Sequence, residues 1–421
     1  MRVVTAMLAL LLGVVSCTTP TNETSEVSPP AVPEEDVAGD AEERPAVGSG
    51  DAAPTDAQAP VVDQWRASWV HLFDDTLKSV DSIDALVDEA AAAGVNVILV
   101  QVARRHDAYY QSGHLPRTND PTMPADLDVL AELIPRAHAA HIQVHAWVGL
   151  APTWHAVYEG IDAPAGWVST EHGPNAAESD RWVTRSVDGE WSTYLDPALP
   201  EVREHLIATI TDIADRYPVD GIHLDYVRYE SQRHGYHPRN LASFAAETGR
   251  SDIPAPDDAR WSDWRRERTR QVIVDAAAAL ALHEVTLSAA TIAWGGGPDN
   301  TSGFAQTNAY TDTLQDWNGW VRDGLLDAVL PMVYFRAHEP DQAANFDQWI
   351  DYLAGLSTDD SGAGTVTVVP GIGGWLNGTD DVAGQITAAR TATGHVAVYS
   401  YQQPTSDEIA DFWKVLGADG W

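Results

Sequence analysis

The chain has 421 residues, of which 44% are hydrophobic and 21% are charged. These proportions are ordinary for a globular protein and exclude a fibrous or wholly disordered chain. The charge is unusual, because 62 Asp and Glu residues against 25 Lys and Arg residues give a formal net charge of −37. Such an acidic chain repels phosphate backbones, so we expect no nucleic-acid partner.

The N-terminus has the pattern of an export signal. Residues 1–17, MRVVTAMLALLLGVVSC, place one arginine before an apolar run that ends in small residues and Cys17. The run is too short for a bilayer-spanning helix. Its last four residues resemble a bacterial lipobox, which implies lipidation of Cys17 and a protein anchored to the membrane of the cell envelope. An ordinary cleaved signal peptide with an incidental cysteine is the alternative.

The next segment, residues 18–61, is rich in Pro, Ala, Thr, Ser, Glu and Asp and contains no aromatic residue. Such a composition cannot bury enough apolar surface to offset chain entropy, so we predict a disordered acidic linker. One folded domain is expected over residues 62–421, and we expect it to be a monomer.

Within that domain, short β-rich runs alternate with longer helical patterns. Strands are predicted at 66–72, 96–103, 143–150, 221–229, 284–293, 327–335, 365–373 and 396–402. Helices are predicted at 81–93, 126–141, 199–216, 261–283, 312–323, 342–355, 379–393 and 406–416. Eight strand–helix units predict an α/β fold of the (β/α)8 TIM-barrel type, with an open doubly wound sheet as the alternative.

The loop lengths orient this barrel. Connections from a helix to the next strand are short, whereas those that follow the third and fourth strands are long, at 151–198 and 230–260. In a (β/α)8 barrel the strand-to-helix loops build the active site. We therefore expect functional residues at the carboxyl ends of the strands.

The fourth strand, DGIHLDYVRYE, carries the first candidate catalytic group. Alternation places Asp225 on one face with His223, Val227 and Tyr229. Burial of a carboxylate in the apolar helix layer is costly, so Asp225 is expected to point into the barrel mouth. A structural aspartate paired with an arginine is the alternative.

Polar and aromatic residues lie on the other strands and beside their ends. Flat aromatic rings stack on the apolar faces of sugars, so we interpret the tryptophans of the strand-to-helix loops as a binding rim, with core packing as the alternative. The predicted substrate-binding residues are Gln101, Arg104, Tyr110, His145, Trp147, Trp154, His223, Arg228, Trp294, Tyr334, Trp375 and Tyr401.

The sequence lacks the common motifs that bind a metal ion or a phosphate-containing cofactor. It has no H-E-x-x-H motif, no cysteine pair, no phosphate-binding loop and no serine nucleophile elbow. We therefore expect neither a metal ion nor a cofactor.

Three segments resemble the glycosyl hydrolase-like 10 family of bacterial (β/α)8 proteins. Gln101–Ser112 is similar to its Q-V-R-G-R-G-D-A-Y-Y-x-S block, and Trp317–Tyr334 ends in a similar P-M-x-Y strand. YLDPALPEVR, followed by YPVDGIHLDYVRY at Tyr217–Tyr229, is the most specific match. The chain departs from the first block at Ala103, which replaces an Arg, and at His106, which replaces a Gly. The resemblance implies an exported glycoside hydrolase, with cell-wall glycan strands as a leading substrate class.

Glycoside hydrolysis usually requires two carboxyl groups. We expect Asp225 to act as nucleophile or base. Candidates for the second are Asp107 and Glu339, with Glu230 behind them. The predicted function is therefore that of a lipid-anchored glycosidase acting on a polysaccharide or on peptidoglycan-type strands. A non-catalytic carbohydrate-binding barrel and a metal-dependent deacetylase or amidohydrolase are the alternatives.

Overall fold

The computed structural model describes residues 62–153, 163–298, 303–357, 366–402 and 409–418. The predicted signal peptide, Cys17, the linker and Trp154 lie outside the described residues. No helix of the described part is both long and apolar enough to cross a membrane.

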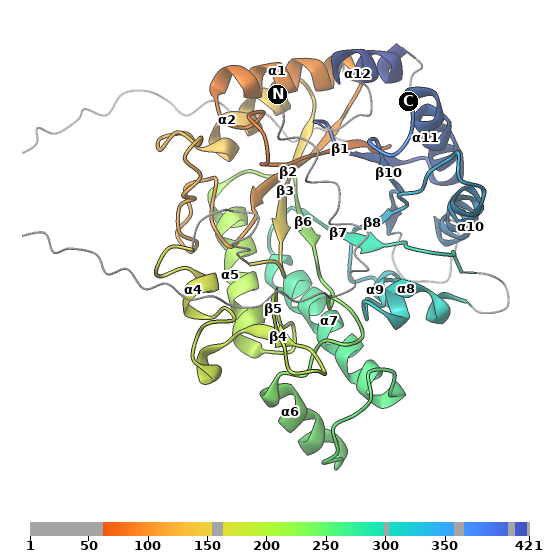
Figure 1. Ribbon diagram of the computed structural model, residues 1–421. Helices are drawn as coiled ribbons and strands as arrows, with labels where there is room; N and C mark the ends of the chain where they lie inside the picture. Colours follow the sequence, from red (N-terminus) through yellow and green to blue (C-terminus); the bar gives the residue numbers. More distant parts are fainter. Residues whose placement is uncertain (1–61, 154–162, 299–302, 358–365, 403–408, 419–421) are drawn as a thin grey trace, which may run out of the picture. The chain divides into compact units, whose positions relative to one another are not determined.

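The chain forms a closed barrel of parallel strands, so the predicted (β/α)8 fold is confirmed (Figure 1). The barrel closes because the last strand pairs with the first, as Arg66 pairs with Val396, which excludes the open doubly wound sheet. The seventh strand is split around Pro370 into two short segments. The barrel strands are β1 (Arg66–Val70), β2 (Val97–Ala103), β3 (Gln143–Gly149), β6 (Gly221–Asp225), β7 (Thr286–Ile292), β8 (Ala328–Met332), β9 (Thr367–Val368), β10 (Gly371–Gly373) and β11 (Val396–Tyr399).

Helices surround the barrel strands (Figure 1). The principal ones are α1 (Val80–Ala92), α2 (Val129–Ala139), α5 (Pro200–Arg216), α7 (Ala259–Leu280), α9 (Trp317–Arg322), α10 (Pro340–Ser357), α11 (Thr379–Thr393) and α12 (Ile409–Ala418). Shorter elements occupy the strand-to-helix loops: α4 (Val168–Glu171), the antiparallel pair β4 (Val183–Arg185) and β5 (Trp191–Leu195), α6 (Pro238–Thr248) and α8 (Asn308–Thr311). Two 3₁₀ turns lie at Glu178–Asp180 and Phe304–Gln306.

The helix predicted at 312–323 is wrong in its boundaries. The structure has two short helices there, α8 and α9, because Leu314 adopts a φ of 56°, which a right-handed helix cannot accommodate. The next residue, Gln315, uses its side chain to join two strand ends. It accepts a hydrogen bond from the Ile292 amide at 2.8 Å and donates one to the Val227 carbonyl at 3.2 Å.

Apolar side chains fill both sides of the barrel wall. The larger cluster lies between the strands and the helices, and a smaller one fills the barrel interior. The buried members of the interior cluster are Trp65, Ala67, Trp69, Val97, Leu99, Trp147, Ala328, Leu330, Val369 and Ala397. Along β1 and β2 they fall at every second position, as the strand period requires.

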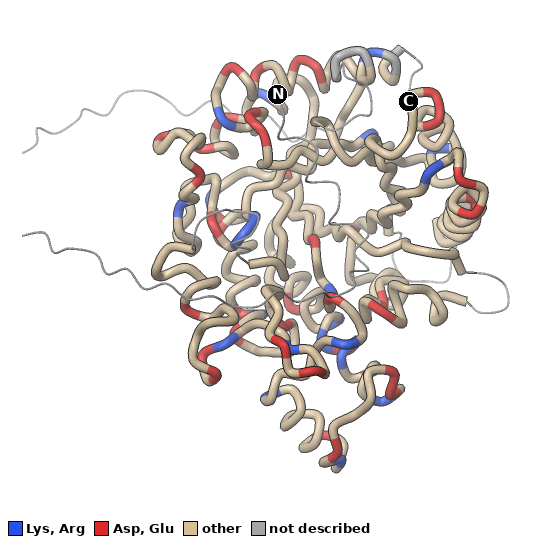
Figure 2. The backbone as a smooth tube through the Cα atoms, viewed as in Figure 1, with Lys and Arg blue, Asp and Glu red and all other residues tan. Residues whose placement is uncertain are grey.

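Figure 2 shows how the charged residues are distributed. Asp and Glu occur throughout the helices and loops, whereas many of the Lys and Arg residues lie among β4, β5, α6 and α7. Several of these arginines form ion pairs, such as Arg268 with Glu247 at 2.8 Å and Arg270 with Asp323 at 2.7 Å.

Hydrogen bonds among three histidines connect the loop after β2 to helix α5. His205 of α5 forms one hydrogen bond with His106 at 3.1 Å and another with His114 at 3.0 Å. Burial, reinforced by the neighbouring histidines, lowers the pKa of His205 to about 2. Burial lowers the pKa of His106 to about 4, although Asp107 opposes the shift. Both rings are therefore neutral in the folded protein at pH 7.

These shifts predict a loss of stability in acid. An unfolded histidine binds a proton below a pKa of about 6.5, whereas the buried rings do not, so the free energy of unfolding falls as pH drops below about 6.5. The expected slope is about 1.4 kcal/mol per pH unit for each histidine. Urea unfolding at pH 7.5 and 5.0 should show a smaller pH dependence in His205→Gln than in the wild type. The exposed His338→Gln variant is the control, and equal slopes in all three proteins would contradict the prediction.

Candidate active site

Asp225 is the last residue of β6 and lies at the carboxyl end of the barrel, as predicted. Its side chain accepts two hydrogen bonds, from the Tyr226 amide to Oδ1 at 2.7 Å and from Trp147 Nε1 to Oδ2 at 3.2 Å. The residue is only 8% exposed. Burial raises the pKa of Asp225 to about 6, against the lowering effects of Arg228 and of the two hydrogen bonds. Asp225 is therefore mostly ionised at pH 7 although it is buried.

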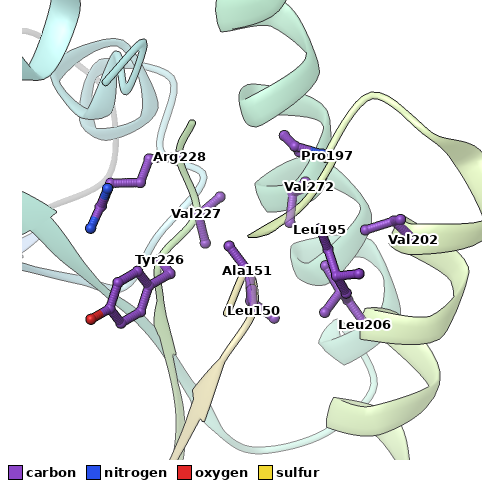
Figure 3. Close-up of a pocket in the computed structure, with 10 residues that line it drawn as sticks. All are labelled: Leu150, Ala151, Leu195, Pro197, Val202, Leu206, Tyr226, Val227, Arg228 and Val272. Carbon is purple, nitrogen blue, oxygen red and sulfur yellow. The ribbon is translucent and has the colours of Figure 1, made fainter. Parts of the chain in front are cut away.

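The backbone turns sharply directly after Asp225. Tyr226 has a φ of 61°, in the left-handed region that residues other than glycine rarely adopt. Beyond this turn Tyr226 and Arg228 point to one side of the chain and Val227 to the other (Figure 3), and Val227 lies in the apolar layer and not beside Asp225. The expectation that Val227 and Tyr229 share a face with Asp225 is wrong for this reason.

Val227 and Tyr229, which follow this turn, pack against the neighbouring hairpin and helices. Val227 lines a small apolar pocket together with Leu195 of β5 and Val202 of α5 (Figure 3). The Tyr229 hydroxyl donates a hydrogen bond to Asp196 at 3.2 Å. These contacts anchor the chain after Asp225 to the hairpin and the helix layer.

Aromatic rings gather around Tyr399, the last residue of β11. Each ring lies within contact range of Tyr399, and they come from four different strands or strand ends. The centroid distances are 6.1 Å to Trp69, 6.3 Å to His71, 6.2 Å to Trp147, 6.0 Å to Tyr334 and 5.4 Å to Trp375. Burial and Asp225 both raise the pKa of Tyr399. The predicted residues Trp147, Tyr334 and Trp375 thus lie together around the mouth.

A second group of rings surrounds Arg228. Its guanidinium carbon lies 4.8 Å from the ring centroid of Tyr226, 5.4 Å from that of Trp294 and 5.9 Å from that of Tyr194. Arg228 also lowers the pKa of Asp225, so cation and carboxylate share one region of the mouth.

The ends of β1 and β2 complete the mouth. Gln101 is buried and accepts a hydrogen bond from the Leu72 amide at 3.2 Å. The guanidinium of Arg104 lies 5.1 Å from the ring of Phe73. Arg104 also contributes to lowering the pKa of the neighbouring His71, after burial.

Sequence reasoning missed His71. Its Nδ1 accepts a hydrogen bond from the Phe73 amide at 3.3 Å, so the ring proton resides on Nε2. That Nε2 is buried and has no hydrogen-bond partner among the described residues. The signal for it in the sequence is a histidine directly after the first strand.

Two predicted binding residues lie deeper in the barrel than the mouth. His145 pairs in register with Gly221, the first residue of β6, and packs edge-on against Trp65 at the opposite end of the barrel. His223 accepts a hydrogen bond from Trp69 Nε1 at 3.0 Å and bonds Ser288 at 2.9 Å. Both histidines are fully buried, so a substrate at the mouth does not reach them.

Two predicted tyrosines face the helix layer instead of the mouth. Tyr110 is fully buried and packs edge-on against Tyr217, which follows α5. Tyr401 donates a hydrogen bond to Glu89 of α1 and stacks on Trp413 of α12. β11 ends at Tyr399, so the alternation that would place Tyr401 on the same face does not extend to it, and Tyr399 but not Tyr401 reaches the mouth.

The three further carboxylates differ in their surroundings. Asp107 is fully buried, and both of its oxygens accept hydrogen bonds from Arg105, at 2.6 Å and 3.1 Å. Glu339 lies just before α10, 3.6 Å from Arg336, with no contact to Asp225. Glu230 is partly exposed and accepts a hydrogen bond from Ser192 at 2.6 Å.

The sequence of this chain also matches a known protein family. A sequence profile of the glycosyl hydrolase-like 10 family matches residues 63–367. The chain belongs to this family. The resemblance indicated by the sequence motifs is confirmed, and the matched region contains β1 through β8 and every group around Asp225 except Trp375 and Tyr399.

Two relatives that match part of this chain are named glycosyl hydrolases. The chain is 26% identical over 278 residues to the glycosyl hydrolase DigH of Escherichia coli (strain K12), covering 60% of this chain and 57% of that protein. It is 23% identical over 260 residues to the glycosyl hydrolase YngK of Bacillus subtilis, covering 59% of this chain and 48% of the relative. The chain thus spans about half the length of these relatives.

Solved structures share the fold. The glycoside hydrolase domain of PgaB (BpsB) from Bordetella bronchiseptica matches 84% of this chain and 97% of its own, with a TM-score of 0.57 and 15% identity. The catalytic domain of a β-amylase from Paenibacillus polymyxa matches 86% of this chain and 100% of its own, with a TM-score of 0.58 and 12% identity.

The histidines and carboxylates of this family member do not form a metal centre in the described part of the chain. No group of three or more His, Cys, Asp or Glu side chains is arranged there to hold a metal ion.

The hydrogen bond from Trp147 offers a direct test of how Asp225 is tuned. Trp147→Phe removes the N–H that stabilises the carboxylate, so the pKa of Asp225 should rise above about 6. Hydrogen bonds to charged groups contribute about 1.5–3 kcal/mol, which corresponds to an increase of about one pH unit or more. The measurement is NMR titration of protein labelled at the aspartate carboxyl carbon, with Asp225→Asn used for assignment. Trp65→Phe, at the other end of the barrel, is the control, and an unchanged pKa in Trp147→Phe would contradict the prediction.

Proposed function

We propose that this protein hydrolyses glycosidic bonds in a polysaccharide or in peptidoglycan-type glycan strands. The observation that carries the proposal is the placement of Asp225, a buried and ionised carboxylate at the mouth of a barrel that belongs to a glycosyl hydrolase-like family. The rings of Trp375, Tyr334 and Trp294 supply flat apolar faces for sugars.

The proposed role of Asp225 is that of base or nucleophile. An ionised carboxylate accepts a proton from water or attacks the anomeric carbon, whereas a general acid must carry a proton. The two hydrogen bonds from Tyr226 and Trp147 stabilise the ionised form and fix its orientation. The low exposure of Asp225 keeps water from competing with the sugar.

Glu230 is the proposed second carboxylate. Glu230 accepts a hydrogen bond from Ser192 of β5, and Tyr194 of the same strand packs edge-on against Tyr226, the residue after Asp225. The other two candidates have partners of their own. Asp107 forms an ion pair with Arg105, and Glu339 accepts a hydrogen bond from Gln342 of α10. The Glu230 side chain is 41% exposed, so water can return a proton to it after each cleavage.

We further propose that the protein is exported and anchored through a lipid on Cys17. This proposal rests on the lipobox-like sequence before that cysteine. It fits a substrate located in the cell envelope.

Asp225→Asn tests the function itself. Loss of the charge at constant shape should lower the cleavage rate by at least about 10²-fold on any glycan that the wild type cuts. The assay is mass spectrometry of products from a polysaccharide panel that includes peptidoglycan strands with and without stem peptides. The surface variant Asp84→Asn is the control. Wild-type activity in a folded Asp225→Asn protein would overturn the role of Asp225, and binding without products by the wild type would indicate a carbohydrate-binding barrel.

Glu230→Gln tests the second carboxylate. A missing general acid slows the release of a poor leaving group, so cleavage of a natural glycan should fall by at least about 10²-fold. An aryl glycoside with an acidic phenol needs little protonation and should lose much less. Glu201→Gln, on the outer face of α5, is the control. Equal losses on the two substrates, or none, would show that Glu230 is not the acid.

A further inference from the structure

Arg228 is a buried cation without a carboxylate partner. It is 8% exposed, and it forms no ion pair with any Asp or Glu of the described segments. The other two buried arginines of the described segments have closer partners, since Arg105 pairs with Asp107 at 2.6 Å and Arg265 donates to the carbonyls of Gln232 and His234 at 2.6 Å and 2.5 Å. A buried charge without an ionic partner is costly, so its retention calls for an explanation.

The protein satisfies Arg228 only in part. One nitrogen donates a long hydrogen bond of 3.4 Å to the Tyr229 carbonyl. The three surrounding rings stabilise the cation through their faces. A guanidinium has five N–H donors, and its planar fork matches a carboxylate. Donor capacity therefore remains for a ligand.

The left-handed turn at Tyr226 brings this cation to the side of the proposed catalytic group. Arg228 and Tyr226 leave the chain on the same side (Figure 3), and the charge of Arg228 acts on Asp225. The ring of Trp294 lies next to the guanidinium, at 5.4 Å. A sugar ring stacked there would present its substituents to Arg228.

We propose that Arg228 binds a carboxylate carried by the substrate, so that the glycan is an acidic one with a carboxylate on the sugar next to the cleaved bond. This inference rests on the proposed function and specifies the substrate class of the same site. The overall charge of −37 does not prevent it, because salt screens the distant acids over about 8–10 Å whereas a buried contact is screened little.

The test compares two forms of one glycan. Peptidoglycan strands freed of stem peptides carry lactyl carboxylates, and carbodiimide activation followed by borohydride converts these to alcohols. The two forms are titrated calorimetrically into Asp225→Asn, which binds without cutting. We expect at least tenfold tighter binding of the carboxylate form.

Substitution of Arg228 in the same Asp225→Asn background assigns the effect. Arg228→Gln should bind both forms equally, Arg228→Lys should keep part of the difference, and Arg233→Gln, an exposed arginine of the same loop, should keep all of it. Equal binding of the two forms by Asp225→Asn overturns the inference, as does binding of neither. An equal loss on both forms in Arg228→Gln also overturns it, because it would show that Arg228 only positions Asp225. Failure of the proposed function is a separate result, namely wild-type protein that cuts neither form.

Discussion

The left-handed backbone at Tyr226 is the constraint on which the geometry of the mouth depends. A residue with a Cβ atom in this conformation costs about 1–2 kcal/mol relative to the right-handed form. The hydrogen bond from its amide to the Asp225 carboxylate, at 2.7 Å, offsets part of that cost and orients the carboxylate at the same time. The same turn directs Val227 into the apolar pocket that Val202 of α5 and Val272 of α7 line, while the guanidinium of Arg228 contacts the rings of Tyr226 and Trp294. The strained turn and the apolar pocket therefore depend on each other.

Below Asp225, in the described part of the chain, the barrel interior carries the neutral histidines His145 and His223. His223 accepts from the Trp69 indole, a group that can only donate, so its ring is neutral, and burial lowers its pKa to about 3. His145 is neutral for the same reason of burial and occupies the space above Gly221, where a Cβ atom would lie 2.4 Å from its ring. With neutral rings beneath it, Asp225 has Arg228 as the cation that lowers its pKa, and hydrogen bonds supply the rest of its stabilisation.

The sequence predicts the barrel well because strand alternation and helix periodicity are local patterns repeated eight times. It also places Asp225 correctly, since β6 is regular up to that residue. It fails where a single backbone angle reverses the pattern, at Tyr226 and at Leu314. It also fails for residues whose partners are distant in sequence: Tyr401 contacts Glu89 of α1, and no local pattern distinguishes it from Tyr399.

His106 shows how a departure from a family pattern can keep the backbone and change the contacts. The similar family block has glycine at this position, and His106 adopts a φ of 61°, the left-handed conformation that glycine favours. The ring that glycine lacks forms the hydrogen bond to His205 of α5. The unfavourable conformation is thus compensated by a tertiary contact that ties the loop after β2 to the helix layer. Arg104 lies two residues before His106, so this contact also restrains the segment that carries the arginine beside Phe73.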